Sequence, residues 1–113
     1  MMKAESHLLK AEEIEVTINF IKDDPSHVSS LVELVYGCVI HYLAYGCEKK
    51  FGRHLDTHVR LQRFLREKDE SEIAAVFGTL DSIRHGRWYG GKGNGDAVED
   101  VVEILEITKR WVE

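Results

Sequence analysis

Residues 24–52 read DPSHVSSLVELVYGCVIHYLAYGCEKKFG, and their pattern indicates the architecture of the whole chain. Asp24 followed by Pro25 is a helix start signal, and Gly52 is a stop signal. Between them, apolar residues recur at spacings of three and four on two adjacent faces. One face holds Val28, Leu31, Val32, Val35, Val39, Tyr42 and Leu43, and the next holds Leu34, Cys38, His41 and Tyr45. So wide a stripe predicts a central helix, running to about Lys50 and buried on more than one side.

Small residues inside this stretch carry their own information. Gly37 and Gly46 each cost about 1 kcal/mol in a helix relative to alanine, which predicts close packing against another backbone. Cys38 and Cys47 are nine residues apart, so on a helix they lie on opposite faces and do not pair. We expect both to be buried thiols in a reducing compartment.

The segment before this helix, residues 7–21, fits two patterns. Ile14, Val16, Ile18 and Phe20 alternate like a strand, whereas the apolar residues of the whole segment also follow helical spacing. The length of the segment favours a helix.

Three further helices are predicted after Gly52. The first opens at Asp56-Thr57, and the second at a capping box formed by Asp69 and Glu72. The apolar stripe of that second helix ends at Arg84, and Asp96 caps the last helix. We therefore predict an all-α fold, an up-and-down bundle of four to five helices that forms a single domain over residues 1–113.

Charge is segregated along the chain, although the net charge is only −5. Residues 49–68 carry seven cations against two acids, and residues 84–95 carry three cations and no acid. A solvated helix face is the simpler interpretation of the first segment, and a polyanion partner is the sharper one. The longest uncharged run, 34–47, is shorter than a membrane span, and the N-terminus lacks the order of a secretory signal. We expect a cytoplasmic protein with no membrane association.

The segment RHGRWYGGKGNG, residues 84–95, is the strongest functional candidate. Its glycines allow close approach of a ligand, and Arg84, Arg87, Tyr89 and Lys92 suit contacts with phosphates and bases. Residues 86–93 match a phosphate-binding loop except at the last position, where glycine replaces the required hydroxyl residue. The segment also follows a helix and not a strand, so we do not expect a nucleotide hydrolase.

Metal and cofactor chemistry has little support in the sequence. His54 and His58 are four residues apart, but a third ligand is missing. We therefore predict neither a metal site nor a cofactor.

Several short motifs together resemble the HEPN family (higher eukaryotes and prokaryotes nucleotide-binding domain), particularly its small stand-alone prokaryotic and archaeal members. They are Tyr36, His41-Tyr42-Leu43, Glu48-Lys49-Lys50-Phe51-Gly52, Thr57-His58-Val59-Arg60-Leu61 and Arg84. The resemblance implies a helical bundle, commonly a homodimer with facing arginines, and often a nucleotidyltransferase-like partner in a toxin–antitoxin pair. Active members cut RNA through R-x(4 to 6)-H. Here Arg84-x(4)-Tyr89 is similar to an arginine-to-tyrosine variant, and no histidine stands at the expected positions.

The resemblance and the residues together define one candidate site. Arg84, Tyr89 and His85 form its reactive group, because a histidine near neutrality and a guanidinium suit ribonuclease-like chemistry. Nucleotide or RNA phosphate would be bound by Arg84, Arg87, Tyr89, Lys92, His58 and Arg60. We expect binding of a nucleotide or RNA phosphate near the end of the fourth helix. The alternatives are a protein-interaction module without activity and a metal-independent ribonuclease.

Overall fold

The computed structural model describes residues 4–55, 58–89 and 94–113, and within these ranges the side chains at 25, 58–59, 87–89 and 94–96 are not described. The described residues form helices and no strand, which confirms the predicted all-α fold. The elements are α1 (Ala4–Ile21), the 3₁₀ turn η1 (Pro25–His27), α2 (Val28–Phe51), α3 (His58–Glu67), α4 (Ser71–Tyr89) and α5 (Asn94–Val112).

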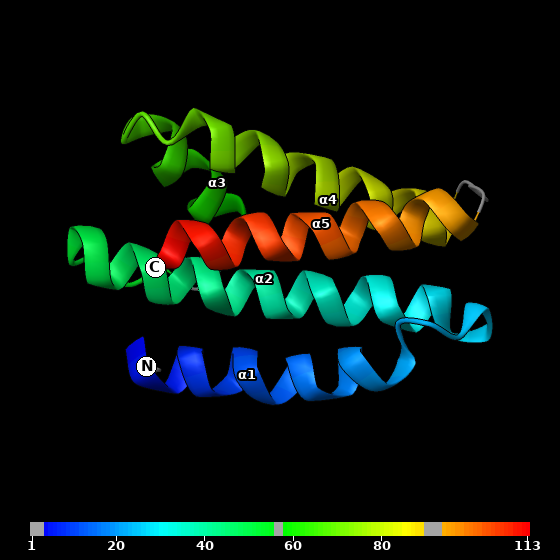
Figure 1. Cartoon of the computed structure of the whole chain (residues 1–113). Coiled ribbons are helices and arrows are strands. Elements are labelled where there is room, and N and C mark those ends of the chain that lie inside the picture. The colour runs from blue at the N-terminus through cyan, green and yellow to red at the C-terminus, as the bar shows by residue number, and fades with distance from the viewer. Residues whose placement is uncertain (1–3, 56–57, 90–93) are drawn as a thin grey trace.

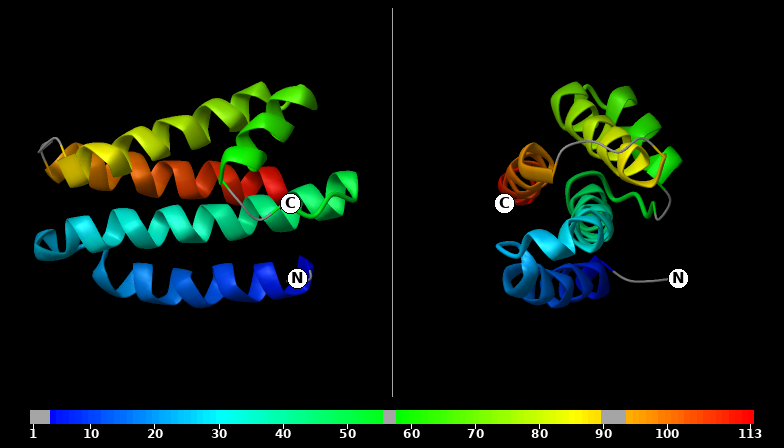
Figure 2. Two further views of the ribbon diagram at one scale, coloured as in Figure 1. Left: turned by 180° about the vertical axis from the view of Figure 1, so that it is seen from behind. Right: turned by 90° about the vertical axis from the view of Figure 1, so that its right-hand side faces the viewer.

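The four long helices run up and down along the molecule, with α2 at the centre (Figure 1). Seen along the bundle, α1 lies on one side of α2, α5 on another, and the α3–α4 pair on a third (Figure 2). The short α3 lies at the end of the bundle where α4 begins. The far end of α4 lies at the opposite end, the same end of the bundle as the turn that joins α1 to α2.

The contested segment before α2 is a helix, as its length predicted. Ala4, His7, Ala11 and Ile18 are its buried positions, and these are three, four and seven residues apart. Val16 and Phe20, which made the strand pattern, are exposed. Burial therefore follows the helical period and not the alternating one.

Both ends of α2 behave as the sequence predicted, with one difference. The Asp24 carboxylate accepts a hydrogen bond from the Ser26 amide at 2.9 Å, but it caps η1, and α2 itself begins at Val28. Gly52 ends α2 with φ +68, and its amide donates to the Glu48 carbonyl at 2.9 Å. Glycine adopts this left-handed conformation without steric cost.

The predicted cap at Asp69 is wrong. Asp69 has φ +59 and ends α3, because its amide donates to the Arg66 carbonyl at 3.2 Å and the next amide, that of Glu70, donates to Leu65 at 2.8 Å. This pair of bonds is a Schellman motif, in which an aspartate occupies the position usually given to glycine. The Glu70 carbonyl then accepts the first bond of α4.

The start of α5 also differs from the prediction. The helix begins at Asn94, so Asp96 lies inside it and is not its cap. Asp56 and Thr57, the predicted opening of the third helix, lie outside the described residues.

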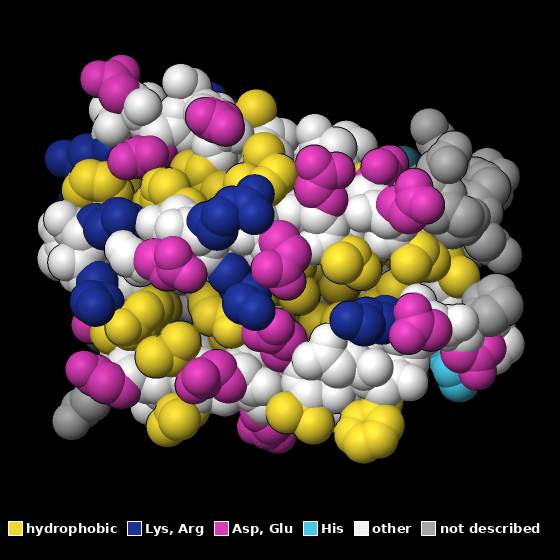
Figure 3. All heavy atoms as spheres, viewed as in Figure 1, with side chains coloured by type: hydrophobic (Ala, Val, Ile, Leu, Met, Phe, Trp, Pro, Cys, Tyr) yellow, Lys and Arg dark blue, Asp and Glu magenta, His cyan; other side chains and the backbone are white. Residues whose placement is uncertain are grey.

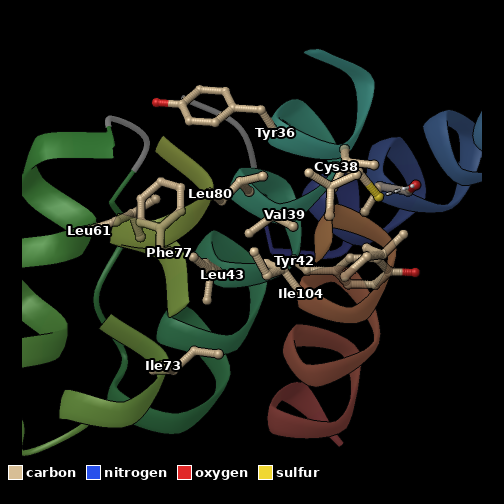
Figure 4. Close-up of a cluster of buried hydrophobic side chains, with 14 of the residues drawn as sticks. Tyr36, Cys38, Val39, Tyr42, Leu43, Leu61, Ile73, Phe77, Leu80 and Ile104 are labelled. Carbon is tan, nitrogen blue, oxygen red and sulfur yellow. Dashed lines mark hydrogen bonds between the residues drawn. The ribbon is translucent and has the colours of Figure 1, made fainter. Parts of the chain in front are cut away.

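One apolar core joins the helices around α2 (Figure 4). Val35, Val39 and Leu43 of α2 are fully buried, and so are Phe77 and Leu80 of α4. Cys38 faces α1, where its thiol donates to the Ala11 carbonyl at 3.3 Å. Cys47 is buried near Glu70, and both thiols are free, as predicted from their spacing. Burial raises the pKa of each thiol to about 12, so neither is a nucleophile near neutral pH.

Helix α2 is long and apolar enough to cross a membrane by length and composition alone. Within the described residues, 56% of its apolar window is buried inside the bundle. A core helix that packs against its neighbours meets the same criteria of length and composition.

Gly46 makes a close contact, but with side chains and not with a backbone. A Cβ atom at this position would lie 2.6 Å from Cγ1 of Val112 and would also overlap the ring of Trp111. Trp111 is held in place because its indole N–H donates to Glu70 at 3.0 Å. The C-terminal turn of α5 thus packs directly on the backbone of α2. Gly37 is less crowded, since Cδ1 of Ile14 is 4.0 Å from its hypothetical Cβ.

We expect Gly46→Ala to lower the free energy of unfolding by about 1–3 kcal/mol, because the added methyl group overpacks this contact. Gly78 of α4 is the matched control, since a Cβ there has no neighbour within 4 Å. Gly78→Ala is expected to stabilise by about 0.5–1 kcal/mol through helix propensity alone. Urea unfolding of both variants measures the difference, and equal stabilisation by both would contradict the packing.

Candidate functional site

Arg84 lies on the side of α4 that faces α2, where it forms an ion pair with Glu33. Its Nε donates to both carboxylate oxygens, at 3.0 Å and 2.8 Å. The guanidinium carbon also lies 4.5 Å from the centre of the Tyr36 ring. One turn of α2 therefore supplies both an anionic and an aromatic contact to the same guanidinium.

The ring of Tyr36 packs against the guanidinium group of Arg84. Tyr36 is 8% exposed, and its ring stacks on Phe77 with 5.8 Å between the centres (Figure 4). Burial, followed by the nearby Asp81 carboxylate, raises the pKa of Tyr36 to about 12. The phenol therefore stays protonated throughout the physiological range.

The arrangement leaves part of the Arg84 side chain accessible. The Arg84 side chain is 38% exposed, and within the described part of the chain its hydrogen bonds use only Nε. The hydrogen bond that Arg84 donates to Glu33 raises the pKa of Arg84, so the group is permanently charged. A guanidinium fixed through Nε keeps its two terminal nitrogens for an anion such as phosphate.

Of the other predicted members of this site, the structure describes the side chain of His85 but not those of Arg87, Tyr89, His58 and Lys92. His85 is exposed on α4, and as the next residue it points about 100° away from Arg84. The side chains of Arg87, Tyr89 and His58 lie outside the described part of the structure, as does Lys92 entirely. The predicted pairing of Arg84 with Tyr89 therefore stays a prediction.

Arg60 is not brought to Arg84. It lies on α3, at the opposite end of the bundle from the end of α4 (Figure 1). Leu61, the next residue of α3, lies beside Phe77 of α4 (Figure 4), and Arg84 is seven positions further along α4, which corresponds to about 10 Å. Arg60 and Arg84 are thus separated along α4.

A cluster of three histidines was missed in the sequence. Nδ1 of His7 on α1 lies 2.9 Å from Nδ1 of His41 on α2. The ring of His54, after α2, lies 5.5 Å from that of His7, and its Nδ1 is 3.1 Å from the Glu48 carboxylate. His41 belonged to the predicted apolar face of α2, but nothing in the sequence shows that histidines from α1 and from the segment after α2 gather in the same place.

The His7–His41 contact depends on protonation. A bond between two imidazole nitrogens needs one ring to donate and the other to accept, so it breaks when both rings are protonated. Burial, followed by the charges of His7 and Lys10, lowers the pKa of His41. The folded protein therefore favours neutral His41.

Metal binding finds no geometric support in the described ranges, where no three His, Cys, Asp or Glu side chains are arranged to hold an ion. His54 lies between α2 and α3 and is not helical, so it does not share a helix face with His58.

No family model matches the chain, and no curated protein or solved structure shows detectable similarity to it. The expectations drawn from the HEPN resemblance therefore depend on the motifs themselves.

We expect acid to weaken the packing of α1 on α2. Because the pKa of His41 is lower in the folded state than in the unfolded state, its contribution is present above the unfolded pKa and is lost as pH falls through the folded pKa. His41→Gln cannot titrate, so its melting temperature should fall less than that of the wild type between about pH 8 and pH 5. Thermal unfolding followed by circular dichroism measures this.

Removing the charge of Lys10 tests the cause of the lowered pKa of His41. Lys10→Gln is expected to raise the pKa of His41 in an NMR titration, whereas Lys22→Gln, at the other end of α1, should leave it unchanged. An acid response in His41→Gln equal to that of the wild type would contradict the assignment.

Proposed function

We propose that this is a cytoplasmic protein that binds a phosphate group of a nucleotide or RNA at the end of α4, through Arg84. The observation that carries the proposal is the guanidinium held by Glu33 through Nε and supported by the Tyr36 ring, with its side chain still partly exposed. Fixing the arginine in advance reduces the entropy lost when an anion binds. The segment 84–95, which begins with Arg84 and contains no acid, adds positive charge.

Binding without cleavage is the version that the geometry favours. Metal-free cleavage of RNA needs a base and an electrophile directed at one reacting phosphate. His85 and Arg84 are adjacent on a helix and diverge by about 100°, so they do not meet at one point. The R-x(4 to 6)-H histidine is also absent from the sequence. The ribonuclease function is thus the lesser alternative.

Arg84→Ala is expected to weaken binding of adenosine monophosphate or a short RNA by about tenfold or more, the value of one charge-assisted hydrogen bond. Arg84→Lys keeps the charge but loses the planar fork, so it should recover only part of this affinity. Isothermal titration calorimetry at low salt measures both. Lys10→Ala, which removes one charge from α1, is the control and should change little.

A purely structural arginine is distinguished by the stability of the same variants. The Arg84–Glu33 pair is partly exposed on both sides, so its loss should cost about 0.2–1 kcal/mol. A folded Arg84→Ala protein with unchanged affinity would refute phosphate binding at this site. Shortening of the RNA by the wild type, absent in Arg84→Ala, would favour the ribonuclease alternative.

A protein-interaction module is the second candidate, and the outer face of α1 favours it. Leu9, Val16 and Phe20 are 66%, 58% and 84% exposed, and their spacing places them along one side of the helix. Hydrophobic side chains appear along this edge of the molecule in Figure 3. Apolar groups aligned on one helix face are typical of a surface that a partner covers, either a second copy or another chain such as a nucleotidyltransferase-like protein.

If a partner covers this face, the double variant Val16→Glu and Phe20→Glu should abolish the association without unfolding the bundle. Light scattering of the purified protein tests for a dimer, and purification from the native host tests for another chain. Thr17→Glu, exposed on the neighbouring side of α1, is the control. A monomer that purifies alone would exclude this function.

A further inference from the structure

Three arginines line a hollow at the end of the bundle opposite to the end of α4. Arg53 follows α2, and Arg60 and Arg63 lie one turn apart on α3; all three are exposed. The hollow has a volume of about 240 Å³, and Leu55 and Phe64 are its buried apolar residues. Glu67 lines one edge and is the one acid among the lining residues that the structure describes.

The surroundings of this basic hollow extend its positive charge. Residues 49–68 carry seven cations and two acids, a net charge of +5 in a chain whose total is −5. A charged helix face that is only solvated does not form a hollow. Here the arginines line a hollow, and they come from two segments: the residues after α2, and helix α3.

Two cations of the protein already lie over the ring of Phe64, which lines the hollow. The Arg53 guanidinium carbon lies 5.4 Å from the centre of the Phe64 ring, and Nζ of Lys68 lies 5.6 Å from it. Phe64 is only 5% exposed, and Phe51 packs edge-on against it. A nucleobase therefore cannot stack on this ring, and the chemistry presented to a ligand is that of the guanidinium groups.

We infer that the basic hollow binds the phosphodiester backbone of a single-stranded nucleic acid, without preference for sequence. Arginine forks suit phosphate oxygens, and a hollow of this size accepts one phosphate group and its sugar more readily than a larger ligand. The seven cations of residues 49–68 favour a polymer over a single free anion.

The inference rests on the proposed function, and it decides between the two ligands left open there. The hollow lies at the end of the bundle where α4 begins, and Arg84 lies toward the other end of α4. Arginines at two separate places suit a polymer with repeated phosphates, whereas a mononucleotide occupies only one of them. The inferred ligand is therefore a nucleic acid strand and not a free nucleotide.

The test compares a single-stranded RNA of about twelve nucleotides with adenosine monophosphate, by fluorescence anisotropy and calorimetry over a range of salt concentrations. Arg53→Gln with Arg63→Gln should weaken RNA binding about tenfold or more and lower the salt slope by about 0.7 for each phosphate that the protein no longer neutralises. Binding of adenosine monophosphate should not change. A mixed-sequence RNA and an oligouridine should behave alike, and a DNA strand of equal length shows whether the sugar matters.

Glu67→Gln provides a variant of opposite sign, because removing this lining acid should strengthen RNA binding. Lys10→Gln removes a positive charge outside the hollow and is the control for net charge. If the double variant and Glu67→Gln leave RNA affinity and salt slope unchanged, the hollow does not bind nucleic acid. If the double variant abolishes RNA binding while Arg84→Ala has no effect, the hollow is the site and the proposed role of Arg84 fails. Circular dichroism confirms that each variant is folded.

Discussion

The burial of α2 on several sides at once is the constraint on which the rest of this protein depends. Val35, Val39 and Leu43 are excluded from water only because α1, α4 and α5 each cover part of the helix. Burying apolar area of this kind is the main favourable term in folding. It also sets how closely the neighbours approach, which is seen where Gly46 admits Trp111 and Val112.

Polar side chains of α2 form hydrogen bonds and ion pairs with side chains of the neighbouring helices. Tyr42 donates to Glu15 of α1 at 2.8 Å, and Lys109 of α5 reaches the same carboxylate at 2.6 Å. Glu33 holds Arg84, and His41 meets His7. Buried polar groups are costly without partners, so these contacts fix how α1, α4 and α5 sit against α2. The candidate functional groups are thus products of packing around one helix.

Partly exposed arginines lie at two separate places in the bundle. Arg84 is a single arginine held by a carboxylate and an aromatic ring, whereas Arg53, Arg60 and Arg63 surround an open hollow. The first arrangement favours orientation of one phosphate, and the second favours attraction of a charged polymer. Glu33 and Glu67 bring a negative charge to each site, which limits how strongly either one holds an isolated anion.

The helical class, the end of α2 at Gly52 and the opposite faces of the two cysteines could be predicted from the sequence, because these follow from the period of the helix and from local turn chemistry. The sequence also marked Arg84 and the basic segment 49–68 as unusual. Local signals failed at Asp69, where a left-handed residue ended one helix one position before the next cap. Only the tertiary structure decided that Glu33 meets Arg84, that three histidines gather, and that Arg60 lies far from the end of α4. The first two depend on contacts between residues 34 to 51 positions apart, and periodicity carries no information on which helix faces another.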